Sequence, residues 1–263
     1  ISGLEKDPVQ LLSQMNIECD AVLVNQCDKD ETEVIHRGEL TWNVLHRNER
    51  GVGKSRNAAL DKAEREYILF SDEDVVYFPG YAEEVVKEFE RYPQADVILF
   101  NVKVCTERRT YWNESRKRLH WYNCGRFPAY SIAAKRGAVV NKGIRYSELF
   151  GGGAKYSNGE DSLFLKDCAD AGLKLYTSTV CIGEEVPRES TWFHGFNEKF
   201  FFDRGVLFYF LYKKLAILWA LRFVLTKREM LQGEIKGREA FKLLRQGIKK
   251  GKEEYLRTKA RRS

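Results

Sequence analysis

Apolar and polar positions alternate along the first 180 residues in blocks that predict a succession of strands and helices. Short apolar runs bounded by polar residues predict strands near 21–25, 40–45, 67–71 and 96–102. Segments between them, near 8–16, 54–64 and 80–91, predict helices. This order is typical of an α/β protein in which helices flank a mainly parallel central sheet.

Two later strands, near 129–134 and 174–177, are predicted on either side of a short amphipathic helix. The apolar face of this helix includes Leu163, Phe164 and Cys168, and the helix is expected to end at Gly172. Its first turn therefore lies near residues 160 and 161.

A further apolar segment, residues 206–225, is rich in Leu, Phe, Tyr and Trp. Three cations interrupt it: Lys213, Lys214 and Arg222. Charges in mid-segment argue against a membrane-spanning helix. One interpretation is a helix at a membrane interface, with its cations on anionic lipid and side chains such as Phe208 and Trp219 in the headgroup boundary. The other is a helix packed on the rest of the protein with its cations directed outward.

Charge divides the chain more sharply than hydropathy does. Residues 199–263 contain 18 Lys and Arg against 6 Asp and Glu, a net charge of +12, whereas the remainder contains 26 against 32, a net charge of −6. At 263 residues and 43% hydrophobic, one α/β domain with an extension is the economical organisation. We therefore expect a catalytic domain over 1–198 and a basic helical extension over 199–263. Because no recognised nucleic-acid motif accompanies the charge, nucleic acid is not an expected partner.

The six cysteines form no C-x-x-C pair and have no zinc-type spacing. Reduced thiols in a cytosolic protein are the simplest interpretation.

An acidic triplet follows the predicted strand at 67–71. Asp72 and Asp74 flank Glu73, and at strand periodicity the two aspartates point to the same side. Carboxylates crowded at the end of a buried strand repel one another, which favours a cation between them. Oxygen ligands suit Mg²⁺ or Mn²⁺. The alternative is an ordinary strand-to-loop exit with its side chains in water.

A basic loop broken by glycines opens the predicted helix near 54–64. Gly53 lets the backbone approach a ligand, and Lys54 and Arg56 beside a helix N-terminus favour phosphate. A solvated loop followed by a capped helix is the alternative.

A run of three glycines precedes the acidic pair Glu160 and Asp161. These glycines are Gly151, Gly152 and Gly153. Acidic residues in a first helical turn are often only partners of the helix dipole. Beside a flexible glycine lip, however, such a carboxylate is able to accept a proton from a substrate hydroxyl.

These segments together resemble family 2 glycosyltransferases of the GT-A fold, as found in bacterial surface-polysaccharide assembly. The motifs are Asn-x-x-Gly-x-Gly-x-Ser-Arg-Asn at 48–57, Ser-Asp-x-Asp at 71–74 and Gly-Glu-Asp at 159–161. Their combination is far more specific than any one of them. The resemblance covers about residues 1–200 and implies a nucleotide-sugar donor and a Mn²⁺ or Mg²⁺ ion.

The resemblance also implies a role for each matching residue. Asp72 and Asp74 would hold the metal and the donor diphosphate, and Asp161 would be the catalytic base with Glu160 beside it. The donor side would also include Gly53, Lys54, Arg56 and Asn57, and the acceptor side Gly151, Gly152 and Gly153.

The chain departs from the family pattern in two places. The family begins with a complete apolar strand, most of which is expected to be missing before Ile1. Where the family often has Asp-Asp-Gly-Ser, the run here is Asn-Gln-Cys-Asp at 25–28. Gln26 or Asp28 is a candidate for contacting the nucleotide base, and a plain strand-end turn is the alternative.

Two residues near the end of the catalytic domain are weaker candidates. A histidine near His194 completes the metal shell in many GT-A enzymes, but a histidine among aromatic residues is more often structural. Arg204 is a candidate for the diphosphate, with pairing to Asp203 or a surface role as the alternative.

The expected function is metal-dependent, inverting transfer of one sugar from a nucleotide-sugar, with UDP as the expected nucleotide, to a hydroxyl of a glycan or lipid-linked acceptor. The Gln-x-x-Arg-Trp signature of processive synthases is absent from the sequence. The basic tail adds an anionic membrane surface as a partner and predicts a cytoplasmic enzyme at the inner face of the cell membrane. A sugar-phosphate nucleotidyltransferase and a non-catalytic nucleotide-sugar-binding module at the membrane surface are the alternatives.

Overall fold

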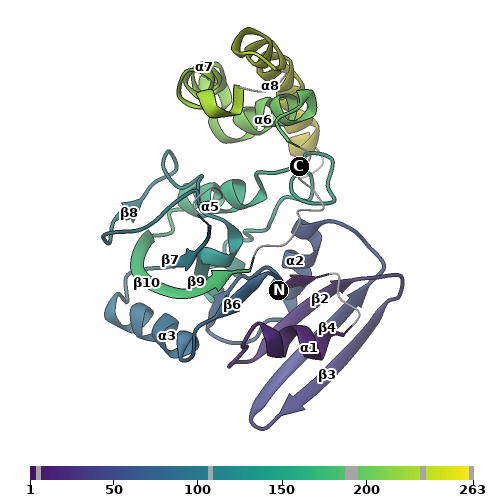
Figure 1. The fold of residues 1–263 in the computed structure, drawn as a ribbon, viewed down its shortest axis with the longest axis vertical. Helices are drawn as coiled ribbons and strands as arrows, with labels where there is room; N and C mark the ends of the chain where they lie inside the picture. Colours follow the sequence, from purple (N-terminus) through teal and green to yellow (C-terminus); the bar gives the residue numbers. More distant parts are fainter. Residues whose placement is uncertain (4–6, 106–108, 187–194, 232–234, 261–263) are drawn as a thin grey trace.

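The computed structural model describes residues 1–3, 7–105, 109–186, 195–231 and 235–260. Its lower part is an α/β unit, and a layer of helices caps that unit at the C-terminal end of the chain (Figure 1). Two sheets, rather than one, form the α/β unit.

The first sheet has the strand order β1-β2-β4-β3. Its strands are β1 (Ser2–Gly3), β2 (Ala21–Gln26), β3 (Glu31–Arg37) and β4 (Leu40–Arg47). β2 pairs in parallel with β1 and β4, whereas β3 and β4 form an antiparallel hairpin. Residues of β2 and β4 are largely buried and those of β3 largely exposed, as expected for an edge strand.

The second sheet has the order β5-β9-β7-β10-β6, and β8 pairs with β10. Its strands are β5 (Tyr67–Leu69), β6 (Val75–Tyr77), β7 (Val97–Lys103), β8 (Arg118–Leu119), β9 (Ile132–Lys135) and β10 (Leu175–Glu185). Only β7 and β10 pair in parallel. An isolated bridge between Ser2 and Asp72 joins the two sheets.

Five helices belong to the α/β unit. They are α1 (Pro8–Gln14), α2 (Val52–Lys62), α3 (Tyr81–Arg91), α4 (Arg136–Val140) and α5 (Glu160–Asp170). Phe89 of α3 and Leu12 of α1 belong to one core cluster with Trp42 of β4, whereas Phe164 of α5 packs in a second cluster. The two clusters use opposite faces of β7, because Ile98 belongs to the first and Leu99 to the second.

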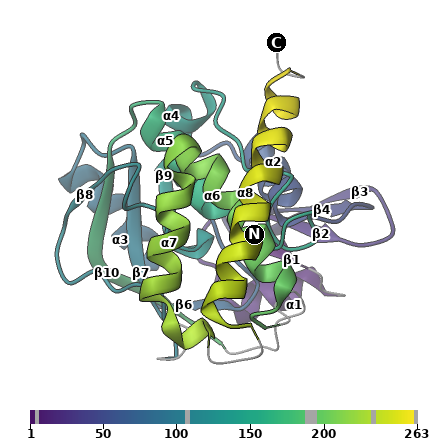
Figure 2. The same ribbon diagram turned by 90° about the horizontal axis from the view of Figure 1, so that it is seen from above.

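The C-terminal part folds as a three-helix layer, here called the helical cap. It consists of α6 (Glu198–Tyr212), α7 (Ala216–Thr226) and α8 (Gly237–Ala260). Seen from above, α7 and α8 lie side by side over α6 (Figure 2). The approach of α6 and α8 is close, since a Cβ at Gly247 would lie 2.0 Å from the carbonyl oxygen of Phe202, and one at Gly205 2.2 Å from that of Leu244.

The predicted α/β fold of the GT-A type, with a helical C-terminal part, is confirmed. The sheet differs from the mainly parallel one expected, because antiparallel pairs outnumber parallel ones among the described strands. Hairpin strands such as β3 are too short a signal for their direction to follow from apolar runs alone.

The prediction of one interfacial helix over 206–225 is wrong. The chain breaks at Lys213, whose φ is +49°, and a 3₁₀ turn at Lys213–Leu215 separates α6 from α7. Phe208 is buried between the helices of the cap, whereas Leu218 on α7 is 60% exposed. The segment therefore has two roles, a buried helix followed by a half-exposed one.

All six cysteines lie in the described part of the chain, and none of them forms a disulfide bond. Within the described ranges, no helix combines the length and the apolar character needed to cross a bilayer.

Candidate functional site

A buried arginine, Arg56 on α2, gathers three carboxylates. Its Nη2 donates to Asp72 Oδ1 at 2.7 Å, and its Nη1 donates to Asp161 Oδ1 at 2.8 Å and to Glu160 Oε1 at 3.2 Å. Only 4% of Arg56 is exposed. Burial opposes its charge, but Asp161 and Asp72 outweigh that effect and raise the pKa of Arg56 well above its usual value. One permanent cation therefore holds together carboxylates from α5 and from the end of β5.

The position of Arg56 differs from the phosphate-facing role expected of it. Its guanidinium is occupied by Asp72, Glu160 and Asp161 and lies over the ring of Tyr146, 5.1 Å from the ring centroid. A contact with the donor diphosphate would require some of these pairs to change. In this structure Arg56 instead connects the acidic turn to the start of α5.

Asp161 is held at both carboxylate oxygens. Its Oδ1 accepts from Arg56, and its Oδ2 accepts from the backbone N–H of Ala129 at 3.1 Å. Burial raises the pKa of Asp161 to about 8 against the lowering effect of Arg56, and Glu160 and Asp72 add to the rise. A carboxylate whose pKa lies near neutral pH suits general base catalysis.

The start of α2 is fixed by hydrogen bonds rather than left open to a ligand. Gln26 is buried, accepts from the N–H of Gly51 at 2.9 Å and donates to Ser2 Oγ at 3.2 Å. Asn57 bonds both ways to the backbone of Tyr146, at 3.0 and 2.8 Å. Gln26 and Asn57 thus hold the loop and α2 in place, and their side-chain amides are already engaged.

Gly53 has a structural reason to be glycine. A Cβ at this position would lie 2.3 Å from the carbonyl oxygen of Ser147. The neighbouring Lys54 is part-exposed and lies 3.7 Å from Glu49. The helix packing accounts for Gly53, while Lys54 remains within the loop at the N-terminus of α2.

The acidic triplet does not continue the strand, as expected from periodicity, but turns. β5 ends at Leu69, Asp72 forms the bridge to Ser2, and the N–H of Val75 donates to the carbonyl of Asp72 at 3.3 Å. Glu73 lies against β1, where its Oε2 is 3.0 Å from the Cβ position of Gly3. Asp72 and Asp74 therefore belong to a turn between β5 and β6, beside the first sheet.

The glycine lip lies where it was expected, next to the acidic pair. Gly151 has φ of +107°, and a Cβ there would meet Val52 at 2.6 Å and the Glu160 carboxyl carbon at 2.9 Å. The carbonyl of Gly152 accepts from the N–H of Val52 at 3.0 Å. The start of α2, the lip at 151–153 and the start of α5 are thus one continuous structure.

The remaining candidates are not gathered around Arg56. Asp28 carries a side chain that is 95% exposed and lies 3.2 Å from Arg50. Arg204 packs in the helical cap over the rings of Phe200 and Phe223, and burial lowers its pKa to about 10. The expected pairing of Arg204 with Asp203 is not seen, because the Asp203 carboxylate accepts from Lys199 and from the N–H of Ser157. His194 lies outside the described residues.

Two residues near the site were not singled out from the sequence. Tyr146 stacks on Phe164 and supports Arg56, and Ala129 donates to Asp161 through its backbone. Tyr146 had a sequence signal in its aromatic character, but Ala129 acts through the main chain, which no residue type reveals.

The metal question turns on how many protein ligands are needed. In the described ranges, no three or more His, Cys, Asp and Glu side chains gather in a way that suits a metal ion. Mg²⁺ and ions like it are commonly held by one or two carboxylates together with substrate phosphates. Asp72, with one oxygen on Arg56 and 31% of its side chain exposed, and Asp74 two residues later fit that kind of donor set.

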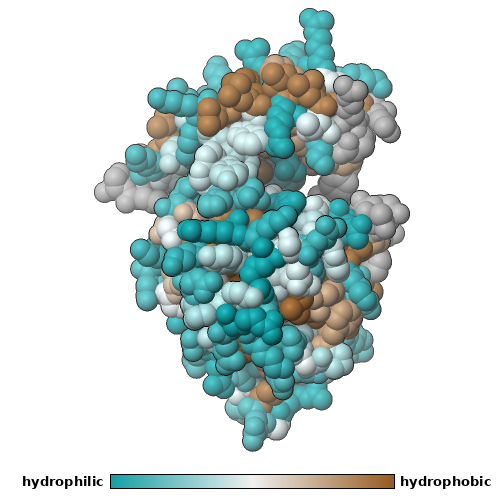
Figure 3. Space-filling view, turned by 90° about the vertical axis from the view of Figure 1, so that its left-hand side faces the viewer, coloured by the Kyte–Doolittle hydropathy of each residue, from teal (hydrophilic) through white to brown (hydrophobic). Residues whose placement is uncertain are grey.

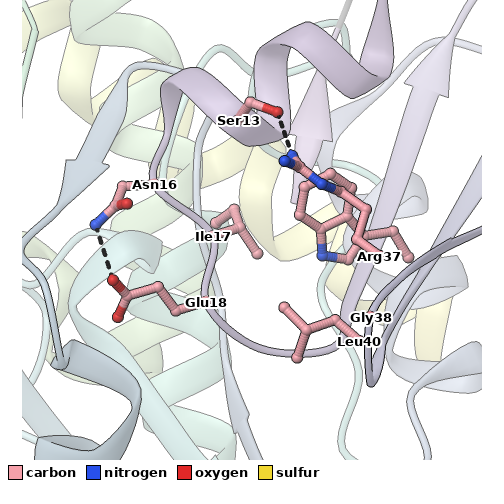
Figure 4. A pocket seen from close by; sticks show the side chains of 8 residues that line it. Ser13, Asn16, Ile17, Glu18, Arg37, Gly38 and Leu40 are labelled. Atoms are coloured by element: carbon pink, nitrogen blue, oxygen red, sulfur yellow. Dashed lines mark hydrogen bonds between the residues drawn. The ribbon is translucent and has the colours of Figure 1, made fainter.

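A pocket of about 620 Å³ lies elsewhere, beside α1 and the β3–β4 turn (Figure 4). In it Arg37 Nη1 donates to Ser13 Oγ at 2.7 Å, and Asn16 donates to Glu18 at 3.4 Å. None of the residues around Arg56 lines this pocket, and its polar groups satisfy one another. Its geometry offers no reacting group, so the chemistry is to be sought at Arg56.

Comparison with known proteins gives one family match and several similar folds. The sequence model for "Glycosyl transferase family 2" matches residues 9–145, more than half of the chain. Comparison with curated protein sequences gave no match.

Solved structures share the fold at low sequence identity. S. aureus TarS 1–349 in complex with UDP-GlcNAc is 16% identical with a TM-score of 0.56, and the match covers 94% of this chain and 70% of that one. The mannosyltransferase PcManGT from Pyrobaculum calidifontis, in complex with GDP-Man and Mn²⁺, is 12% identical with a TM-score of 0.51, covering 98% and 78%. The motifs at 48–57, 71–74 and 159–161, the fold and the family match agree, and the chain belongs to glycosyl transferase family 2 and is a glycosyltransferase.

Proposed function

We propose that this glycosyltransferase moves a single sugar from a nucleotide-diphosphate sugar to an acceptor hydroxyl, with inversion at the anomeric carbon. The observation that carries the proposal is the shared guanidinium of Arg56, which lies 2.7 Å from Asp72 and 2.8 Å from Asp161. Because one planar group touches both, the carboxylate assigned to the donor and the carboxylate assigned to the base lie close together. Donor and acceptor are thereby brought to adjoining positions.

Asp161 is proposed as the general base and Glu160 as its neighbour in the same pair. The acceptor hydroxyl gives its proton to Asp161, the hydroxyl oxygen forms a bond to the anomeric carbon, and the bond from that carbon to the diphosphate oxygen breaks. The raised pKa of Asp161 supports this role, since a stronger base takes the proton more readily. The lip at 151–153 is proposed as the acceptor side, because Gly151 abuts Glu160.

Asp72 and Asp74 are proposed to hold a divalent ion, Mn²⁺ or Mg²⁺, together with the donor diphosphate. When bound, such an ion offsets the negative charge that develops on the leaving diphosphate. PcManGT is described in complex with Mn²⁺, which supports the proposal for this chain. His194 is retained as a proposed additional ligand.

The donor is proposed to be a UDP-sugar, on the likeness to TarS in complex with UDP-GlcNAc. Asp28 is the proposed contact for the nucleotide base, because its exposed carboxylate stands at the end of β2 whereas Gln26 is engaged. Lys54, at the open end of α2, is the proposed cation for the diphosphate.

The test is a panel of UDP-, GDP- and dTDP-sugars with the purified protein, with and without Mn²⁺. Thermal shift first identifies the donors that bind, and release of nucleoside diphosphate then identifies the donor that turns over. A UDP-sugar that stabilises the fold only with Mn²⁺ supports the proposal. Release of pyrophosphate from a nucleoside triphosphate and a sugar phosphate would instead identify a nucleotidyltransferase, and binding without turnover would identify a binding module.

The enzyme is also proposed to work at the cytoplasmic, inner face of the cell membrane on a glycan or lipid-linked acceptor, with 1–198 as catalytic domain and 199–263 as extension. Two features of the helical cap support a membrane surface. On α7, Ile217, Leu218, Leu221 and Leu225 are exposed along one side, opposite the buried Ala216 and Ala220. Brown, hydrophobic atoms gather over this end of the molecule in Figure 3.

The second feature is a row of cations on α8. Five exposed residues recur every three or four positions: Arg238, Lys242, Arg245, Lys249 and Lys252. They lie on the side opposite the small buried residues with which α8 packs on α6, and so face outward as the α7 leucines do. An apolar stripe beside a row of cations is the arrangement that binds anionic lipid.

Vesicle co-sedimentation tests the membrane proposal. The wild type should bind anionic vesicles at low salt and be released at high salt. Arg245→Glu with Lys249→Glu should weaken binding at least roughly 30-fold, at about 1 kcal/mol per cation, whereas Lys142→Glu with Lys174→Glu on the α/β unit should not. Wild-type protein that stays in the supernatant at low salt would contradict the proposal, and a dimer in solution would show that a second copy covers the face.

A further inference from the structure

A second concave surface, the cationic groove, lies between the α/β unit and the helical cap. It encloses about 710 Å³, a volume within the usual range for ligand sites. One wall is formed by the segment around β8, with Trp112, Arg118 and Arg126, and the other by Tyr212 and Arg222 of the cap. Figure 3 faces this side of the molecule and shows a mainly hydrophilic surface below the brown cap.

The charge of the cationic groove is strongly one-sided. Four cations line it, Lys117, Arg118, Arg126 and Arg222, against a single acid, Glu114. All four are exposed, and within the described ranges none of them forms an ion pair with a carboxylate. Four unpaired cations around one concavity create a positive potential that attracts an anionic ligand.

Exposed aromatic rings accompany the cations. Trp112 is 39% exposed and Tyr122 52% exposed, although large aromatic side chains gain most when they are covered. Tyr122 also stacks on His120 at 5.5 Å, which holds its ring in place. Flat rings beside guanidinium groups suit a ligand that has both apolar faces and acidic groups.

The cationic groove leads to the base. Gly125, in its wall, accepts at its carbonyl from Ser162 Oγ at 3.0 Å, and Ser162 directly follows Asp161. Four residues after Gly125, the N–H of Ala129 donates to Asp161 itself. The segment 125–129 therefore runs from the groove to the proposed base.

We propose that the cationic groove binds the acceptor, and that this acceptor is an anionic glycan carrying phosphate or carboxylate groups. The inference rests on the proposed role of Asp161 as base. Sugar faces lie on Trp112 and Tyr122, acidic groups lie on Arg118, Arg126 and Arg222, and a hydroxyl is directed toward Asp161. Phosphate and carboxylate meet the same guanidinium chemistry, since both accept paired hydrogen bonds from arginine.

The test is titration of the full chain with oligosaccharides, followed by tryptophan fluorescence, since Trp112 lines the groove. The probes are maltotetraose, phosphorylated maltotetraose and hyaluronan tetrasaccharide, which separate neutral, phosphate-bearing and carboxylate-bearing ligands. Binding of one or both anionic probes, with little binding of maltotetraose and a signal lost in Trp112→Phe, is expected. Arg118→Gln and Arg126→Gln should each weaken that binding roughly tenfold, and Lys142→Gln, an exposed cation elsewhere, should not.

Donor binding, measured by thermal shift with UDP-sugar and Mn²⁺, should be unchanged in both arginine variants. Equal binding of neutral and anionic probes, or unchanged binding in Arg118→Gln and Arg126→Gln, would overturn the proposal. Tighter binding of an eight-nucleotide single strand than of either anionic sugar would overturn it in favour of nucleic acid. Failure of donor binding in the wild type would contradict the donor assignment and leave the groove measurement standing.

Discussion

The guanidinium of Arg56 lies over the ring of Tyr146, and Tyr146 in turn stacks on Phe164 with ring centroids 4.3 Å apart. Phe164 belongs to α5, the helix that begins with Glu160 and Asp161. The cation and the carboxylates that it binds thus rest on one aromatic support, so their relative positions are set by the core.

Replacing Arg56 should affect both the fold and the titration of the base. Arg56→Gln leaves buried carboxylates unpaired, and we expect the free energy of unfolding to fall by about 3–5 kcal/mol. Since Arg56 lowers the pKa of Asp161, its loss should also shift the rise of kcat/KM to higher pH. Denaturant unfolding and a pH–rate profile measure the two effects.

Arg56→Lys keeps the charge and should shift the profile less than Arg56→Gln does. Arg65→Gln removes an exposed ion pair with Asp20 and should cost less than about 1 kcal/mol. Equal stability of Arg56→Gln and Arg65→Gln would show that the Arg56 cluster is not structural.

The wild-type enzyme should become more active as the pH rises. A base must be deprotonated to act, and with a pKa of about 8 for Asp161 the deprotonated fraction grows between about pH 7 and about pH 9. A divalent ion at Asp72 cancels a charge that raises this pKa, so kcat should rise at lower pH than kcat/KM. Profiles of both constants test this, and a kcat/KM that does not change over that range would contradict it.

Asp161→Asn should lower transfer by roughly 10²–10⁴-fold, the usual contribution of a general base, with donor affinity nearly unchanged. Asparagine is close in shape to aspartate and still offers an oxygen to Arg56, so the fold should survive. The measurement pairs calorimetric donor binding with the rate of transfer. Loss of donor binding along with transfer would assign Asp161 to the donor side.

Asp74→Asn should abolish the dependence of donor binding on Mn²⁺. The change removes one of two carboxylates available to an ion and leaves the shape of the turn intact. Calorimetry of donor binding with and without Mn²⁺ measures this. Glu73→Gln is the matched control, because Glu73 lies against β1 and should keep the metal dependence. Unchanged affinity in Asp74→Asn would remove the metal assignment.

The contact between α6 and α8 should be intolerant of a single methyl group. In Gly247→Ala the new Cβ would lie 2.0 Å from a backbone oxygen, and we expect a loss of about 1–3 kcal/mol or more. Gly137→Ala on α4, with its nearest neighbour 3.8 Å away, is the control. Thermal unfolding compares the two, and equal melting temperatures would show that the cap can separate from α6 at little cost.

Most helices and strands were predictable because their apolar periodicity is local. The partners of Arg56 were not, since Glu160 and Asp161 are 104 and 105 residues away along the chain. Local chemistry favoured phosphate for a cation at a helix N-terminus, and only the fold shows which anions reach it first.

The tail shows a second limit of sequence reading. Residues 206–225 look like one amphipathic segment, because a break at Lys213 with positive φ leaves no apolar gap. Once the break is known, the buried Phe208 and the exposed Leu218 fall on different helices with different neighbours. Apolar character alone does not state whether a side chain faces a core or a surface.

The glycine lip rests on the cap at several points. Phe150 meets Phe210 with ring centroids 5.1 Å apart, a Cβ at Gly159 would lie 2.4 Å from Leu207, and the N–H of Ser157 donates to Asp203. The cap therefore cannot be exchanged like a fusion tag. A chimera that takes its last three helices from a relative must also take the 149–159 loop, or its acceptor specificity will change for reasons unrelated to the membrane.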